Sequence, residues 1–78
     1  LLSLTQRQYD SLVSWAFNVG ASAARGSTLV KRLNAGLFAD VPFELKRWNK
    51  SGGKVDKILV GRRAREAARF AEDLDASG

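Results

Sequence analysis

The 78-residue chain contains no cysteine, no histidine and no methionine, and it has a single proline. Without cysteine it can form no disulfide bond and offers no thiol nucleophile, and this absence says little about the compartment in which it acts. Cysteine and histidine are the usual protein ligands of zinc and other transition metals. We therefore expect no metal site, and no motif in the chain indicates a cofactor.

Long apolar runs are also missing. No stretch approaches the roughly 20 residues that a membrane-spanning helix needs, and no signal-peptide pattern is present. The chain begins at Leu1 without a methionine, in what already resembles the lead-in to a helix, so we expect a fragment or a product of processing. A hydrophobic content of 45% over residues 1–78 predicts a single globular domain with one modest core.

The net charge of +5 is unevenly distributed along the chain. The segment from Lys46 to Arg69 holds nine basic and two acidic residues, a net charge of +7, which leaves −2 on the rest. Such a segment is either a solvated basic face or a surface for a polyanion such as cell wall, nucleic acid or an anionic membrane.

The segment from Leu4 to Gly20 is predicted to be the central helix. Thr5 and Gln8 form a capping-box pattern at its start, and Gly20 suits the residue that ends it. Apolar residues at helical spacing predict a buried stripe, with Trp15 partly outside it. The predicted stripe consists of Tyr9, Leu12, Val13, Ala16, Phe17 and Val19.

The other apolar segments predict an all-α fold of about five short helices packed round that central hydrophobic helix. Asp40 is expected to cap the fourth helix, and Asn49–Lys54 is expected to be a loop because it contains Ser-Gly-Gly. The expected segments are a turn at Ala21–Arg25, a helix capped by Ser27 and ending at Gly36, a helix carrying Val41, Leu45 and Trp48, a short apolar element at Val55–Val60, and a last helix from about Arg62 to Leu74.

The last helix is predicted to pack through its alanines, because small side chains allow two helices to approach closely. Arg62 and Glu66 are expected to form an i,i+4 ion pair. The acids Glu66, Glu72 and Asp73 are assigned to its charged face. The predicted packing stripe consists of Ala64, Ala67, Ala68, Ala71 and Leu74.

Four motifs, in one order, resemble those of the phage-type lysozymes, the muramidase endolysins. Trp15–Gly20 (WAFNVG) resembles their (S/F)-x-F-N-x-G segment, and Ser27–Gly36 (STLVKRLNAG) resembles S-T-L-x-(R/K)-K-L-N-x-G. Arg47–Lys54 (RWNKSGGK) resembles R-W-x-x-A-G-G-K, and Gly61–Ala67 (GRRAREA) resembles G-L-x-x-R-R-x-x-E. The set covers nearly the whole chain.

This resemblance implies that residues 1–78 are the C-terminal helical lobe of such an enzyme, with the N-terminal catalytic segment absent. The parent would hydrolyse peptidoglycan between N-acetylmuramic acid and N-acetylglucosamine during host cell lysis. It would be made in the bacterial cytoplasm and act on the wall in the periplasm or outside. The chain itself would contain no catalytic residue and would be inactive alone. Its partners would be peptidoglycan and the missing lobe. Without that lobe, the chain would bury its exposed apolar surface by self-association.

By the same resemblance, Phe17, Asn18 and Gly20 would line the saccharide cleft at the end of the central helix. The residues alone allow another interpretation, in which Phe17 is a core residue and Asn18 merely caps the helix end. Thr28 would hydrogen-bond across the cleft or simply belong to the first turn of its helix. Arg47 would meet the anionic peptide stems.

Three further residues bear on catalysis. Arg62 would face the catalytic glutamate of the other lobe and tune it, or, without that partner, be solvated or pair with Glu66. Glu44, one turn before Trp48, is the one acid of this chain considered as a candidate catalytic residue. No second carboxylate lies at a recognisable sequence spacing from it. Trp48 is expected in the core rather than as a platform for a sugar.

Two other classes of function remain open from the sequence. Basic helices joined by short turns also fit a nucleic-acid-binding module, with Gly61–Arg69 as a recognition helix. The chain could equally be a non-catalytic wall-binding adaptor derived from a lysozyme.

Overall fold

The structure is a computed structural model that describes residues 4–74. Within that range the chain forms five α-helices, one 3₁₀ turn and one short hairpin, so the predicted helical fold is confirmed. The elements are α1 (Gln6–Val19), α2 (Ala21–Arg25), α3 (Thr28–Asn34), the 3₁₀ turn η1 (Phe38–Asp40), α4 (Val41–Lys46), β1 (Lys50–Ser51), β2 (Lys54–Val55) and α5 (Lys57–Glu72).

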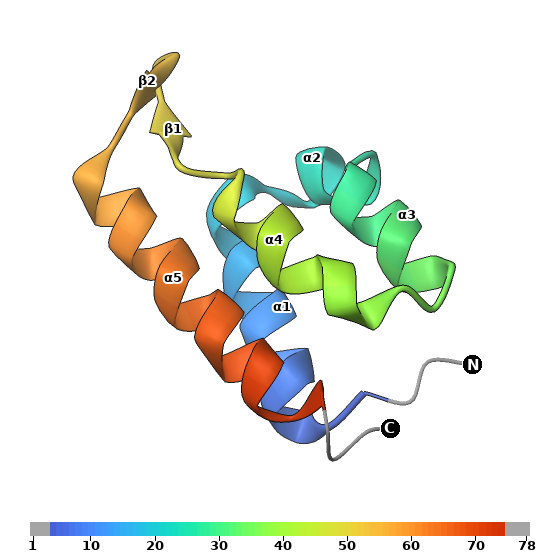
Figure 1. Cartoon of the computed structure of the whole chain (residues 1–78). Coiled ribbons are helices and arrows are strands. Elements are labelled where there is room, and N and C mark those ends of the chain that lie inside the picture. The colour runs from blue at the N-terminus through green and yellow to red at the C-terminus, as the bar shows by residue number, and fades with distance from the viewer. Residues whose placement is uncertain (1–3, 75–78) are drawn as a thin grey trace.

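The two long helices, α1 and α5, pack against each other, and α4 packs against α5 (Figure 1). The short helices α2 and α3 lie on the other side of α4 from α5, and the hairpin projects from the body before α5 begins (Figure 1). All five α-helices contribute buried residues to the core, α2 through Ala24 alone. The buried apolar residues of the core are Leu12, Trp15, Ala24, Leu29, Leu33, Val41, Leu45, Ala67 and Phe70.

The predicted capping box at the start of α1 is confirmed. The Gln8 backbone N–H donates to Thr5 Oγ1 at 3.1 Å, and the Thr5 N–H donates to Gln8 Oε1 at 3.0 Å. These two bonds satisfy donors that have no partner within the first turn of a helix. Gly20 ends α1 with φ of +97°, a conformation that side-chain-bearing residues rarely adopt.

The predicted buried stripe of α1 is confirmed for Leu12, Ala16 and Val19, which pack in or against the core, and is wrong for its other three residues. The buried residues of the helix are Gln8, Ser11, Leu12 and Trp15, whereas Tyr9, Val13 and Phe17 are exposed. The inward face is selected by hydrogen bonds as well as by hydrophobicity. Gln8 Nε2 donates to the Phe70 carbonyl of α5 at 3.3 Å, which a purely apolar residue cannot do. As a result, much of the apolar surface of α1 faces outward.

Helix α5 begins at Lys57, five residues before the predicted start at Arg62. Asp56 caps it, because Oδ1 accepts the N–H groups of Ile58 at 2.8 Å and Leu59 at 3.1 Å. The segment expected as a separate apolar element at Val55–Val60 is therefore divided between β2 and the first turn of α5.

The predicted alanine stripe of α5 is wrong at Ala64, Ala68 and Ala71, which are exposed, whereas Ala67 is buried and Leu74 packs against the core as predicted. The buried face instead consists of Arg63, Glu66, Ala67 and Phe70, so Glu66 does not lie on the charged outer face. Burial of two charged residues is possible because they pair with each other.

Two turns also differ from expectation. Residues 49–54 do not form a simple loop but include most of a β-hairpin, with Lys50 opposite Val55. Gly52 and Gly53 have φ of +59° and +83°, as a type I′ turn requires. Asp40 lies within η1 and makes no side-chain capping bond to α4, which begins directly at Val41.

Candidate functional site

A small open pocket lies between α3 and α4, and we name it the Thr28 pocket. It is lined by Thr28, Glu44, Arg47 and Trp48. Residues three positions apart share one face of a helix, so Glu44 of α4 lies beside Arg47, the C-cap residue of that helix, and Trp48 follows directly. The capping hydroxyl of Ser27, which accepts the Val30 N–H at 3.1 Å, fixes the start of α3 beside them.

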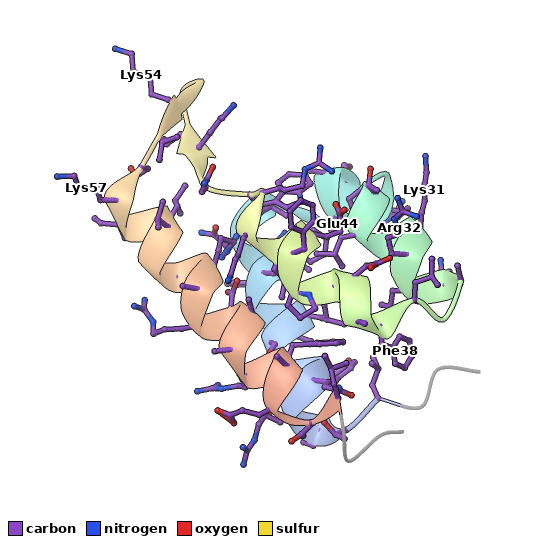
Figure 2. All side chains as sticks on the ribbon, viewed as in Figure 1. Lys31, Arg32, Phe38, Glu44, Lys54 and Lys57 are labelled. Atoms are coloured by element: carbon purple, nitrogen blue, oxygen red, sulfur yellow. The ribbon has the colours of Figure 1, made fainter. Side chains whose placement is uncertain are left out.

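Charge within the Thr28 pocket is paired. Glu44 is 5% exposed, and its Oε1 accepts a hydrogen bond from Arg47 Nη1 at 3.1 Å. Arg47 is itself exposed, so its remaining donors face solvent. Figure 2 marks Glu44 on the side of α4 that faces α2 and α3. The pocket can therefore hold an anionic or hydroxylated group against Arg47 and Thr28.

The apolar wall of this pocket is held by the core. The indole of Trp48 packs edge to face on Trp15, with ring centroids 5.7 Å apart. Trp48 is half-buried, so it both packs on the core, as expected, and lines the pocket. The structure thus brings Thr28 and Arg47 together with Glu44 and Trp48.

The other expected cleft residues lie in a different place. Phe17 and Gly20 line a shallow apolar depression with Val13, and Phe17 is 89% exposed. The alternative in which Phe17 is a core residue is therefore wrong. Asn18 is exposed, and its side-chain amide makes no hydrogen bond to any residue in the range 4–74, so it does not cap the end of α1. The structure does not bring these residues into the Thr28 pocket.

A second polar pocket lies along the contact of α1 and α5, and we name it the Arg62 pocket. Its lining residues are Ser11, Ser14, Arg62, Arg65, Glu66 and Arg69. Because α5 residues 62, 65 and 69 recur at helical spacing, three guanidinium groups border the same hollow. Over residues 4–74 neither Arg65 nor Arg69 forms an ion pair, so the rim of the pocket carries uncompensated positive charge.

Glu66 is the hub of the Arg62 pocket. Its Oε2 accepts the Ser14 hydroxyl at 2.6 Å and Arg63 Nη2 at 3.0 Å, and Oε1 lies 2.7 Å from Arg63 Nε. Arg62 Nε lies 3.5 Å from Glu66 Oε2, which confirms the predicted Arg62–Glu66 pair. Arg62 Nη2 also donates to Ser14 Oγ at 3.5 Å. These contacts join α1 to α5 through charge.

Arg63 differs from its neighbour because it is buried. Burial lowers the pKa of Arg63 from its ordinary value, while the nearby Glu66 carboxylate acts in the opposite direction. Arg62 remains partly exposed at the mouth of the pocket, so it can meet a group arriving from outside. The two adjacent arginines therefore have different surroundings, since Arg63 is internal and Arg62 faces the pocket.

Several residues of the Arg62 pocket were missed in the sequence. Ser11 and Ser14 face α5 at i,i+3 spacing, and Arg65 and Arg69 continue the spacing of Arg62. The helical spacing of the three arginines can be seen in the sequence, but the sequence does not reveal that α1 packs against this face of α5.

Among residues 4–74, no three acidic, histidine or cysteine side chains converge as metal ligands would. Over the same part of the chain, no helix combines the length and apolar character of a membrane span.

Comparison with known proteins shows the family to which this helical chain belongs. The family model described as phage lysozyme matches residues 1–66. The match covers α1 to α4, the hairpin and the first ten residues of α5, and with them the Thr28 pocket. The chain belongs to the phage lysozyme family.

Individual relatives agree with this assignment. The endolysin of Bacillus phage PZA is 55% identical over 69 residues, which are 88% of this chain and 27% of the relative. The endolysin of Salmonella phage P22 is 43% identical over 67 residues, which are 86% of this chain and 45% of the relative. The SAR-endolysin of Escherichia phage Mu is 40% identical over 75 residues, which are 91% of this chain and 44% of the relative. The chain therefore spans less than half of each of these relatives.

Proposed function

We propose that this chain is the C-terminal helical lobe of a phage lysozyme. The complete enzyme cleaves peptidoglycan between N-acetylmuramic acid and N-acetylglucosamine, and so acts on the host cell wall, in the periplasm or outside the cell, during lysis. The match of residues 1–66 to the phage lysozyme family carries this proposal. In it, the lobe supplies one wall of the substrate cleft, and the catalytic acid comes from the rest of the enzyme.

The contacts of the buried acids support an external catalytic acid. A glycosidase of this kind needs two carboxyl groups that flank one glycosidic bond, about 5–10 Å apart. Glu44 and Glu66 are the buried carboxylates of residues 4–74, and each is bonded to an arginine. They line different pockets, between different helices. Neither therefore has the partner that the reaction requires.

The two pockets suggest different roles for the lobe. In the Thr28 pocket, Arg47 would bind carboxylates of the peptide stems and Thr28 would hydrogen-bond the glycan. Phe17, Asn18 and Gly20 would extend the binding surface at the end of α1, where an exposed aromatic ring can stack on a sugar. Each of these roles is part of the proposal.

In the Arg62 pocket, Arg62 would form an ion pair with a carboxylate of the other lobe. The pocket has three arginines but only one internal carboxylate, Glu66, and that carboxylate is already bonded to Ser14 and Arg63. An acid arriving from outside would meet Arg62 at the mouth. As a positioning residue, Arg62 would orient that acid and favour its charged form.

A turbidity assay on outer-membrane-stripped bacterial walls tests the proposal. The 78-residue chain alone should leave the suspension cloudy. A chimera in which this chain replaces the matched 69-residue region of the Bacillus phage PZA endolysin should clear it. Circular dichroism of both proteins checks that each is folded.

Each outcome has a definite meaning. A folded chimera that leaves the walls intact overturns the proposal, and if the chain alone still sediments with walls, the adaptor reading replaces it. If the chain alone clears the walls, catalysis resides within these residues, and loss of clearing in Glu44→Gln would assign it to Glu44.

Burial of Arg63 argues against a nucleic-acid-binding helix, because that arginine cannot reach a groove.

A further inference from the structure

The β1–β2 hairpin and the first turn of α5 form a projecting tip, which we define as residues 50–58. Both strands are exposed along their whole length, and the hairpin stands away from the helices (Figure 1). The type I′ turn at Gly52–Gly53 and the bond from Asp56 N–H to the Asn49 carbonyl at 2.8 Å hold it in one conformation. The tip is therefore a hydrogen-bonded projection, and none of its residues lines the Thr28 pocket or the Arg62 pocket.

The tip carries concentrated positive charge. It holds Lys50, Lys54 and Lys57, all exposed, and one acid, Asp56. The Asp56 carboxylate accepts two backbone N–H groups of α5, so none of the lysines depends on it as a partner. Figure 2 shows the side chains of Lys54 and Lys57 extending away from the body at this end of the molecule.

Apolar side chains lie among these lysines. Ile58 is 78% exposed and Val55 is 62% exposed. Lys50 lies directly opposite Val55 in the hairpin, so their side chains share one face of the ribbon. Soluble polyanions offer nothing for exposed isoleucine and valine to enter, whereas a lipid surface offers both anionic headgroups and an acyl boundary.

We propose that residues 50–58 dock the protein onto an anionic lipid surface, with Val55 and Ile58 entering the headgroup region and the three lysines contacting lipid phosphates. This role is separate from the cleft functions proposed above, because no residue of the tip lines the Thr28 pocket or the Arg62 pocket. It requires no membrane-spanning segment, since the contact is interfacial.

Cosedimentation of the 78-residue chain with lipid vesicles tests the proposal. Binding is expected to vesicles of equal parts phosphatidylglycerol and phosphatidylcholine, and not to phosphatidylcholine alone. Lys54→Ala/Lys57→Ala should weaken binding about 25-fold, at about fivefold for each lysine near an anionic surface. Lys31→Ala/Arg32→Ala removes the same charge from α3, across the molecule in Figure 2, and should change binding less than threefold.

The apolar part of the proposal has its own test. Ile58→Ser should weaken vesicle binding at least fivefold, whereas Phe43→Ser on α4, where the ring is 66% exposed, should leave it unchanged, with circular dichroism confirming the helices in both. Equal losses from the two charge variants, or from the two serine variants, would overturn the tip as the site. Equal binding of wild type and Ile58→Ser, accompanied by equally tight binding to long-chain polyphosphate, would overturn the lipid in favour of a soluble polyanion.

Discussion

The indole rings of Trp15 and Trp48 pack edge to face, with centroids 5.7 Å apart and planes inclined at 74°. Trp15 is buried at the centre of α1, and Trp48 follows the end of α4 and lines the Thr28 pocket. Edge-to-face contact adds to the stabilisation that ring burial provides. The core and the pocket wall are therefore one structural unit.

Trp48→Ala should lower the free energy of unfolding by about 2 kcal/mol, below the range for a fully buried ring because Trp48 is half-buried. Urea unfolding followed by circular dichroism measures it. Trp48→Phe keeps an aromatic edge near Trp15 and should lose less than half as much. A loss under about 0.5 kcal/mol for the alanine variant would contradict the coupling of pocket wall and core.

Glu66→Ala should destabilise the chain by about 3 kcal/mol, because it leaves Arg63 buried without its counter-charge. The matched control is Glu72→Ala on the same helix. Glu72 Oε2 lies 2.7 Å from Arg7 Nη1, but the Glu72 side chain is 57% exposed. That exposed pair should contribute about 0.5 kcal/mol or less. Chemical denaturation of both variants makes the comparison.

Restoring balance at Arg63 provides a further check on that cluster. Adding Arg63→Met to Glu66→Ala should recover part of the lost stability, because the buried unpaired charge is then gone. Failure of the double variant to recover any stability would mean that the loss comes from Ser14 or from the helix itself.

Arg62→Ala in the chimera should reduce the rate of wall hydrolysis on the order of tenfold, if Arg62 orients the catalytic acid. Removing a positive charge beside a carboxyl group raises its pKa, so the acid stays protonated to higher pH. The alkaline limb of the pH–rate profile should therefore move to higher pH. Arg62→Lys keeps the charge and should keep the limb in place. A rate loss with an unmoved limb would indicate a purely structural role.

The outward apolar face of α1 predicts self-association of the chain alone. Apolar groups of Tyr9, Val13 and Leu12 border a groove shared with α2 and α3, and exposed apolar patches favour association. Sedimentation velocity should show a mass that rises with concentration. Val13→Lys should suppress the rise, whereas Val55→Lys, on the hairpin tip, should not. A constant monomer mass up to about 1 mM would contradict this expectation.

Local signals in the sequence were reliable where a structure depends on neighbours along the chain. The capping box of Thr5 and Gln8 and the cap at Ser27 both depend on contacts within three residues, and both were predicted. The cap at Asp56 depends on a contact of the same kind, but the last helix was predicted to begin only at about Arg62. A single glycine within α5 was in fact tolerated.

Long-range packing was beyond the sequence. Hydrophobicity alone favoured Val13 and Phe17 as the inward face of α1, whereas hydrogen bonding to α5 brought Gln8 inward. The buried Glu66 carboxylate accepts the hydroxyl of Ser14, which lies 52 residues away along the chain. Thr28 and Arg47 line one pocket, whereas Phe17 and Gly20 line a separate depression, and nothing in the sequence indicated this separation.

The two faces of α1 also imply two kinds of tolerance to substitution. On the side facing α5, the Gln8 amide reaches the Phe70 carbonyl and the Ser14 hydroxyl reaches Glu66, so shape and donor position both matter there. On the outer side, Val13 contributes volume and hydrophobicity only. Related sequences should therefore keep particular polar residues on the first side while exchanging one apolar residue for another on the second.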